Sequence, residues 1–255
     1  MPAAPRPAFG LLTLLVLPWA LVLIGIVLAI VLTPVAAILA LVGVVLAVAS
    51  FRAGNPARLL AALGGKEHTG VDEPRLFNVV EGLCLENGIP MPKVRILEDQ
   101  AANSLVLSDG HDGLALIVTR GLLDALDRIQ LEGVMADTLA AAKRGDVHGA
   151  AMIARALGAL ATVSSSAATL AWRFTDPARQ FRTDREACRM TCFPPGLLSA
   201  LSLLQDLPTT PAGLPMVLSR LSAPYWLVPL EVGKPRTTRA GELDLDLRVS
   251  ALAEL

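Results

Sequence analysis

The sequence predicts an α+β protein that is mainly helical, in which an N-terminal transmembrane helical hairpin precedes a domain with a small β-sheet. The hairpin is predicted because no charged residue occurs between residues 7 and 51, about twice the ~20 residues that a helix needs to cross a bilayer. The domain is predicted because later apolar residues recur mostly at helical spacing and alternate, as in strands, in a few short segments. The boundaries follow this pattern: a hairpin over residues 1–52, a juxtamembrane linker over 53–74 and a domain over 75–255.

The charge-free run is long enough for two spans, over residues 10–32 and 35–50, with Thr33-Pro34 as the break between them. Cationic residues flank the spans, at Arg6, Arg52, Arg58 and Lys66. Because Lys and Arg are enriched on the cytoplasmic side, we expect a multi-pass protein of the inner (cytoplasmic) membrane with its domain in the cytoplasm. A cleaved signal peptide would have a shorter apolar core with soluble sequence after it, so the sequence favours the hairpin.

Composition narrows the classes of partner. The net charge is −1, so there is no basic surplus for binding nucleic acid. Three cysteines, Cys84, Cys188 and Cys192, are an odd number without Cys-x-x-Cys spacing, which argues against a disulfide framework and against a zinc site made of cysteines alone. A reducing, cytoplasmic setting fits this cysteine usage.

The remaining sequence predicts helices around one small sheet. Helical spacing and end signals predict helices over residues 56–63, 73–89, 191–208 and 242–255, with two more between 120 and 146. Alternation predicts strands over residues 93–98, 103–108 and 114–119, and a short strand or extended piece over 224–230. The second and third strands are expected to be joined by a turn.

Residues 148–172 are ambiguous, because residues 156–172 are uncharged and rich in Ala, Gly and Ser. A third membrane span here would place everything after Trp172 on the opposite side of the membrane. The sequence therefore favours a buried or membrane-lying helix. His68 and His111 lie in polar linker and turn sequence, where solvated side chains are expected.

Six segments occur in a fixed order after the hairpin. They are "EPRLFNVVEGLCLENGIPMPKVRIL" from residue 73, "ANSL" from 102, "IVTRGLLDALDRIQLEGVMA" from 117, "RQFRTD" from 179, "TCFPPGLLSAL" from 191 and "DLRVSALAEL" from 246. Together they resemble the HtpX-like family of membrane-bound zinc metallopeptidases, gluzincins that also include the CAAX prenyl proteases. The resemblance spans nearly the whole chain and implies a zincin-like domain after the hairpin.

The resemblance also marks what differs in this chain. The family's zinc site needs H-E-x-x-H on a helix, because two imidazoles one turn apart meet one zinc ion while the Glu between them serves as general base. A third ligand, Glu, comes from a later helix. The corresponding positions here are Asp137, Thr138, Ala141 and Gln180. Asp184, which matches the second acidic residue of the later motif, and Arg248 are retained.

These substitutions predict no metal, no cofactor and no catalytic residue of the family's kind. Asp137 alone offers no tetrahedral set of nitrogen and sulfur ligands. Without zinc, nothing lowers the pKa of water from about 15.7 toward about 7, and without the Glu base a further factor of about 10²–10⁴ in rate is absent. We therefore expect a pseudoenzyme, in which hydrolysis by the family's mechanism is excluded.

The leading hypothesis is a catalytically inactive, membrane-anchored pseudopeptidase that acts as a scaffold or accessory subunit of an integral membrane protein complex in the lipid bilayer. One alternative is an active hydrolase with non-zinc chemistry, in which Asp137 and Asp184 form an acid pair. Another is a decoy that binds unfolded membrane-protein segments in a cleft and along an exposed sheet edge. An acid pair requires facing carboxylates, a decoy an open groove, and a scaffold an apolar exposed face or a tightly bound partner.

The resemblance implies that the four changed positions surround one small site. We expect the helix over residues 131–143 to pack against the segment over residues 180–184. Because Gln180 both donates and accepts hydrogen bonds, a bond from Gln180 to Thr138 or Asp137 is expected to replace metal coordination.

Overall fold

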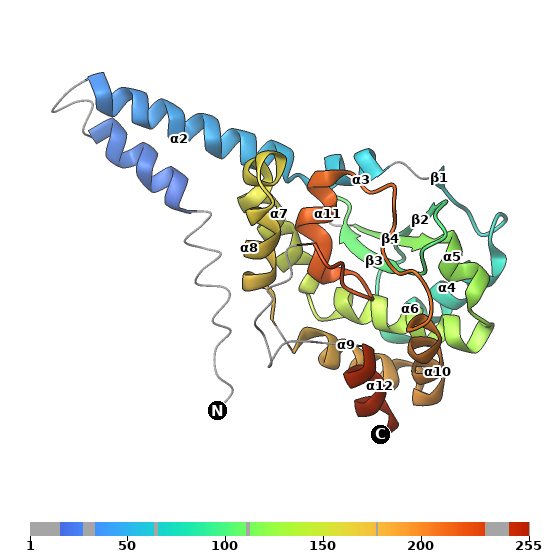
Figure 1. The fold of residues 1–255 in the computed structure, drawn as a ribbon. Helices are drawn as coiled ribbons and strands as arrows, with labels where there is room; N and C mark the ends of the chain where they lie inside the picture. The colour runs from blue at the N-terminus through green and yellow to red at the C-terminus, as the bar shows by residue number, and fades with distance from the viewer. Residues whose placement is uncertain are drawn as a thin grey trace.

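The helices and strands of the domain appear largely where the sequence pattern predicts them (Figure 1). The computed structural model describes residues 16–27, 34–63, 66–110, 113–176, 178–232 and 245–254. The strands are β1 (Lys66–Glu67), β2 (Lys93–Leu97), β3 (Ser104–Ser108) and β4 (Leu114–Thr119). The helices are Val16–Val27, α2 (Pro34–Ala53), α3 (Pro56–Leu63), α4 (Pro74–Asn87), α5 (Arg120–Ala125), α6 (Arg128–Lys143), α7 (Asp146–Val163), α8 (Ser166–Phe174), α9 (Arg179–Thr191), α10 (Pro194–Leu204), α11 (Met216–Ser222) and α12 (Leu245–Ala253). The predicted α+β class, mainly helical with a small sheet, is confirmed.

The strands form one mixed sheet in the order β1-β2-β4-β3. β2 pairs with β4 in parallel, whereas β3 pairs with β4 antiparallel, as expected for two strands joined by a turn. Residues 111–112 of that turn lie outside the described residues. The two-residue β1 adds an antiparallel strand beside β2, so β3 is the opposite edge strand of the sheet.

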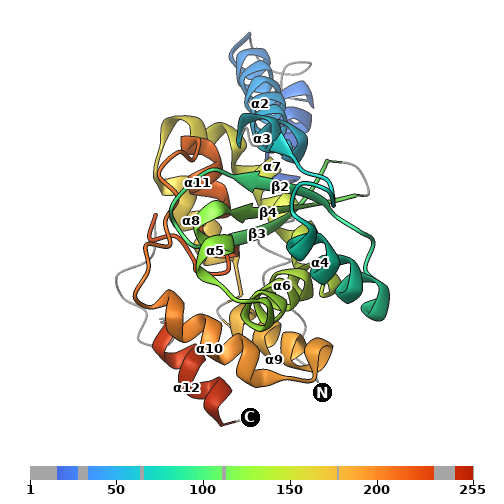
Figure 2. The ribbon, with the colours of Figure 1, turned by 90° about the vertical axis from the view of Figure 1, so that its right-hand side faces the viewer.

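Helices cover both faces of the sheet, and the side chains of β4 alternate between two cores. Leu116 and Val118 pack into the core under α4, α6, α9, α10 and α12, which we call the site layer (Figure 2). Ala115 and Ile117 pack into the opposite core under α3, α7, α8 and α11, which we call the hairpin layer. Successive side chains of a strand point to opposite faces. Burial of both faces therefore explains why the strand sequence "LALIV" is continuously apolar.

α6 is the central helix of the site layer. It begins with a capping box, in which Asp127 Oδ1 accepts from the Gln130 amide at 2.8 Å and Gln130 Oε1 accepts from the Asp127 amide at 3.0 Å. Farther along, a Cβ atom at Gly133 would lie 2.6 Å from the amide nitrogen of Leu197 in α10. Glycine is therefore required where these two helices cross.

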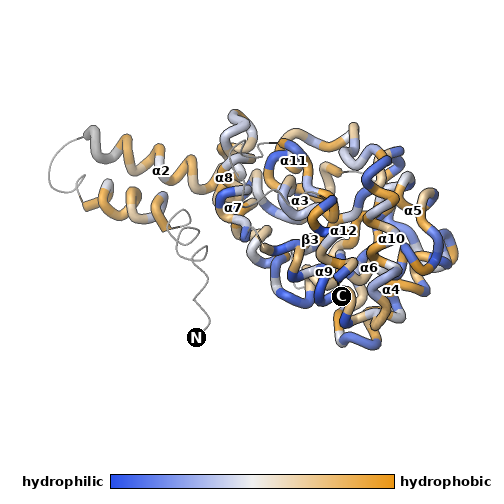
Figure 3. The backbone as a smooth tube through the Cα atoms, turned by 60° about the horizontal axis from the view of Figure 1, so that its bottom comes forward, coloured by the Kyte–Doolittle hydropathy of each residue, from blue (hydrophilic) through white to orange (hydrophobic). Residues whose placement is uncertain are grey.

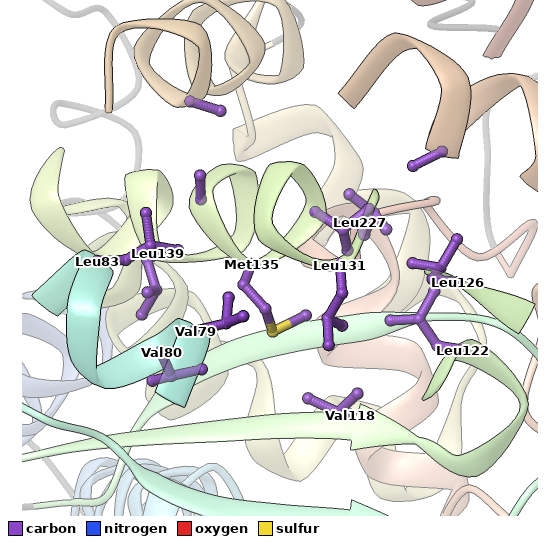
Figure 4. Packing of buried hydrophobic residues seen from close by; sticks show 14 of the residues in the cluster. Val79, Val80, Leu83, Val118, Leu122, Leu126, Leu131, Met135, Leu139 and Leu227 are labelled. Atoms are coloured by element: carbon purple, nitrogen blue, oxygen red, sulfur yellow. The ribbon is translucent and has the colours of Figure 1, made fainter. Parts of the chain in front are cut away.

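One face of α6 points into the core that it shares with α4 and the sheet. Leu131, Met135 and Leu139 are fully buried and lie toward Val80 of α4 and Val118 of β4 (Figure 4). Residues four apart share one helix face, so this row anchors α6 and leaves its opposite face free to build the site.

Close backbone contacts join the N-terminal helices to the domain. A Cβ atom at Gly43 of α2 would lie 3.3 Å from Val22 Cγ2 of the first helix, so small residues bring these two helices together. At the end of α2, a Cβ atom at Gly158 of α7 would lie 2.3 Å from Ser50 O and 2.4 Å from the Gly54 nitrogen. The domain is therefore attached to α2 through glycines that no larger residue can replace without movement.

The predicted transmembrane hairpin is only partly described, because residues 10–15 and 28–33 lie outside the described residues. Among the helices that are described, none alone combines the length and hydropathy needed to cross a bilayer. α2 from Ile38 and α3 reach that requirement only together, as a pair bent by 50°. Membrane spanning by this region stays a prediction.

Two sequence expectations need correction. Residues 148–172 are not one helix, because Ser164 adopts extended φ and ψ of −140° and 140° and separates α7 from α8. The extended piece expected from Pro224 begins instead with a 3₁₀ turn, Ala223–Tyr225, that follows the unexpected helix α11. Serine and proline weaken regular helices, and residues of these types lie at both places.

Candidate functional site

The helices α6 and α9 bring the four changed positions together. Asp137, Thr138 and Ala141 of α6 and Gln180 of α9 line one cavity of about 10 Å³. The predicted packing of residues 131–143 against residues 180–184 is therefore confirmed. A cavity of this size holds about one water molecule, so the site is a small polar pocket.

Arg248 of α12 is the central charge of the site, and its side chain is buried. Its Nε donates to Asp184 Oδ2 at 2.9 Å and its Nη2 donates to Asp184 Oδ1 at 2.5 Å. Nη1 donates to the carbonyl oxygen of Leu227 at 2.6 Å, and Nη2 also lies 3.4 Å from Asp137 Oδ2. One guanidinium therefore ties α12 to α9, to α6 and to the segment around residue 227.

Asp137 is the less well paired of the two carboxylates. Burial and the nearby Asp184 carboxylate raise its pKa to about 6, while the Arg248 guanidinium acts in the opposite direction. Its Oδ2 faces Arg248, but its Oδ1 is buried without a hydrogen-bond partner among the described residues. Ionised Asp137 is thus held at the site at some expense in free energy.

The prediction of a hydrogen bond from Gln180 to Thr138 or Asp137 is wrong. The Nε2 atom of Gln180 donates to Leu227 O at 3.4 Å, and its Oε1 has no partner among the described residues. The hydroxyl of Thr138 lies 2.7 Å from Ser104 Oγ of β3 and donates to Val134 O at 3.0 Å. The threonine is therefore committed to the sheet and to its own helix, which leaves Gln180 to bind the segment that covers the site.

That segment, residues 225–230, lies along the sheet edge, and we call it the strap. The amide of Leu227 donates to Ser104 O of β3 at 2.9 Å. Asn103 binds both backbone groups of Val228 in the strap, because its Nδ2 donates to Val228 O at 2.8 Å and its Oδ1 accepts from the Val228 amide at 3.1 Å. Trp226, which belongs to the strap, has a fully buried side chain. At Ser104, the sheet edge expected to pair with an extended peptide is therefore already bonded to the chain's own strap.

Sequence reasoning missed Arg179, which the structure places at the same cavity. Its guanidinium lies 5.3 Å from the ring centroid of Tyr225, and its Nε lies 3.2 Å from Asp146 Oδ2. The pair joins the start of α9 to the start of α7. Its position as the first residue of "RQFRTD" was the only available signal, and nothing in that signal names Tyr225 as a neighbour.

The residues present do not fit the zinc ion that the family resemblance implies. Ala141 has no ligand atom, Thr138 is bonded elsewhere, and the Asp137 carboxylate faces a guanidinium. Within the described ranges, no group of three or more His, Cys, Asp or Glu side chains converges as metal ligands would. A tetrahedral zinc site requires about four nitrogen, oxygen or sulfur ligands, and this arrangement offers one carboxylate beside a fixed cation.

The chain is similar to several proteins named "Protease HtpX homolog". It is 30% identical to the one from Dictyoglomus thermophilum over 175 residues, which are 56% of this chain and 58% of that protein. It is 41% identical to the one from Dictyoglomus turgidum over 85 residues, 33% of this chain and 28% of that protein. The one from Salinibacter ruber is 28% identical over 170 residues, 58% of this chain and 62% of that protein.

The matches cover less than two thirds of the length of each of these relatives. No family model matches the chain. No solved structure matches it. Several curated relatives at 28–41% identity over part of the chain, together with the segment order described above, support a relationship to the HtpX-like family.

Proposed function

We propose that this chain is a catalytically inactive pseudopeptidase, anchored in the inner membrane, that serves as a scaffold or accessory subunit of a membrane protein complex. The observation that carries the proposal is the composition of the site. The positions of the family's zinc ligands and general base converge on one cavity, but they hold Asp137, Thr138, Ala141 and Gln180. The four positions lie together, but without the side chains that the family's chemistry needs.

The acid-pair alternative receives less support from the geometry. Both oxygens of Asp184 accept from Arg248, so this carboxylate is occupied and cannot serve as a free acid or base. Asp137 shares the same guanidinium. General acid–base catalysis requires two groups within reach of a substrate proton, and a cavity with room for about one water admits no peptide.

The decoy alternative is also disfavoured, because it requires an open groove. β3 is the sheet edge at which an extended peptide would bind, and the strap already takes the carbonyl oxygen of Ser104. Peptide binding there would have to displace Trp226 and Leu227 from buried positions. A scaffold needs no open groove, and a fixed strap helps to keep its surface in one shape.

Membrane anchoring is supported by the exposed apolar surface of the first two helices. Figure 3 shows an apolar helix pair that projects from the rest of the chain. Side chains that are more than half exposed include Leu17, Trp19, Leu23, Ile38, Leu41 and Val45. Exposed apolar surface on this scale is typical of contact with lipid or with another protein. We therefore assign this region to the bilayer, and the cationic flanks Arg6, Arg52 and Arg58 favour an orientation with both ends in the cytoplasm.

Activity is tested by measuring metal content and cleavage together. The purified full chain should contain no stoichiometric zinc and should leave an unfolded membrane-protein substrate intact. Zinc at one equivalent per chain, lost to a chelator together with proteolysis, would refute the proposal.

A reconstructed site provides the matched positive control. The variant that combines Asp137→His, Thr138→Glu, Ala141→His and Gln180→Glu restores the family's ligand set at positions that already share one cavity. It should bind one zinc per chain, whereas a variant that lacks only Ala141→His should bind zinc much more weakly. If the full reconstruction binds no zinc, the four positions are not arranged as in an active relative.

The accessory role is tested separately from activity. A reporter fused after Leu255 should be cytoplasmic, and the chain extracted in mild detergent should migrate as a complex with a stoichiometric membrane protein. A free monomer at every salt concentration would contradict the accessory role and leave the inactivity result unaffected.

A further inference from the structure

Charge is distributed unevenly between different parts of this chain. Three segments, residues 1–66, 147–175 and 207–230, contain seven Lys and Arg residues and no Asp or Glu. All 23 Asp and Glu residues lie elsewhere, together with only 15 of the 22 Lys and Arg residues. The near-zero net charge of the chain therefore hides a cationic part and an acidic part.

The fold gathers the cationic segments into one region. They contain the first helix, α2, α3, α7 after its first residue, α8 and α11. α7 contacts α2, α8 and α11. α3, α7, α8 and α11 together form the hairpin layer. In Figure 1, α7 and α8 lie beside the end of α2 that joins the domain. The acid-free segments are thus next to the segment that we assign to the bilayer.

The arginines of this region have no acidic partner among the described residues. Arg52 in the last turn of α2, Arg58 of α3 and Arg173 of α8 are exposed. The guanidinium of Arg155 lies 5.2 Å from the ring centroid of Phe51, and its Nε is buried without a hydrogen-bond partner. None of these four arginines forms an ion pair with a carboxylate of the described residues.

We propose that the hairpin layer binds the headgroups of anionic phospholipids at the surface of the bilayer that holds the hairpin. This inference rests on the proposed membrane anchoring. A lipid surface is favoured over an acidic protein because the cations continue the apolar surface of α2. Phe51 is 54% exposed, and the next residue, Arg52, is cationic and exposed. This order, apolar and aromatic residues followed by Arg, is typical of the boundary between hydrocarbon and headgroups.

Attraction of this kind depends on charge rather than on a shaped pocket. One Lys or Arg near an anionic membrane surface contributes about fivefold in affinity, which corresponds to about 1 kcal/mol. Because the Debye length shortens to about 3 Å in 1 M salt, high salt should remove most of the effect. Replacing arginine by lysine should preserve most of it.

The test uses the full chain in nanodiscs of phosphatidylcholine, with and without about 30% phosphatidylglycerol. Hydrogen exchange of α8 amides should be at least about fivefold slower in the anionic discs, and 1 M salt should abolish this difference. The double variant Arg58→Gln and Arg173→Gln should lose the difference, and the corresponding Lys variant should keep it. The control, Arg128→Gln with Arg185→Gln, removes two arginines that are also exposed, but from the site layer, and should behave like the wild type.

Flotation with neutral vesicles separates the two levels of the proposal. If the full chain floats but α8 exchanges equally in both kinds of disc, or if the control pair acts like the test pair, the headgroup inference is overturned while anchoring stands. If purified acidic protein, and not anionic lipid, protects α8, the layer is a protein-binding surface and the inference is also overturned. If the chain floats with no vesicle, the proposed anchoring itself is wrong.

Discussion

Removing the guanidinium of Arg248 should destabilise the fold more than any other single charge change. The variant Arg248→Met keeps a long side chain but leaves the buried carboxylates of Asp137 and Asp184 facing each other without a cation. Breaking a buried ion pair from one side costs about 3–5 kcal/mol. The carbonyl oxygen of Leu227 also loses its 2.6 Å donor, which adds about 1 kcal/mol.

A loss of about 4–6 kcal/mol is comparable with the whole free energy of unfolding of many proteins, so two further variants keep the prediction testable. Arg248→Lys retains the charge but cannot make the paired bonds to both Asp184 oxygens, and it should lose about 1–3 kcal/mol. Adding Asp137→Asn and Asp184→Asn to Arg248→Met removes the uncompensated charges and should recover several kcal/mol, because neutral groups cost far less to bury than unpaired ions.

The assay is denaturant unfolding of the full chain in mild detergent at pH 7, followed by circular dichroism. The control is Arg185→Met, because Arg185 is exposed and has no ion-pair partner among the described residues, so its change should stay within about 0.5 kcal/mol. If Arg248→Met unfolds within 1 kcal/mol of the wild type, or if the triple variant is no more stable than Arg248→Met alone, the buried ion-pair cluster does not hold α12 in place.

Three further changes test other parts of the structure. The pKa of Asp137 is about 6 in the folded chain against 3.8 ordinarily, so its ionisation opposes folding. As the pH rises from about 4 to about 6, the free energy of unfolding of the wild type should therefore fall relative to that of Asp137→Asn, by at most about 3 kcal/mol. Parallel stability curves for the two proteins across this pH range would contradict the prediction. Gly158→Ala places a methyl group 2.3 Å from the Ser50 carbonyl oxygen, so trypsin should cut the connection after α2 several-fold faster. The control is Gly149→Ala in the same helix, where a Cβ meets no atom within 4 Å, and it should leave the cleavage rate unchanged. Asn103→Ala leaves strap backbone groups without partners and should lower the free energy of unfolding by at least about 2 kcal/mol and speed hydrogen exchange in the strap; unchanged exchange would show that Asn103 does not hold it.

Local sequence was sufficient to predict most of the domain's helices and strands. The helix predicted over residues 56–63 is α3, and the helix predicted over residues 73–89 is α4, which ends at Gly88 with a left-handed φ of 65°. The three predicted strands are β2, β3 and β4. Apolar periodicity, prolines at helix starts and glycine caps act over a few residues, so they can be read without knowing the fold.

The chemical content of the site was also readable from the sequence. Asp137, Thr138, Ala141 and Gln180 were identified by their places within segments that resemble a known family, and the structure brings them to one cavity. The identity of each side chain limits which ligands it can offer, whatever the surrounding fold.

Only the tertiary structure decided which partners these side chains use. Arg248 reaches Asp184 across 64 positions and Asp137 across 111, and Gln180 turns to the strap rather than to Thr138. The strap itself reads as a short apolar segment, and its place along β3 depends on Asn103, which lies 125 positions from Val228. Hydrogen-bond partners at such separations are selected by packing and burial, which no local pattern encodes.

The separation of charge depends on both the local sequence and the tertiary structure. Acid-free segments are visible in the sequence, but they are interrupted by acidic ones, and nothing local indicates that α3, α7, α8 and α11 cover the same face of the sheet. Alternation along β4 sends neighbouring residues to opposite cores, so segments distant in sequence are sorted into two layers. The charges of each segment follow from the sequence, whereas their meeting on one surface is a consequence of that sorting.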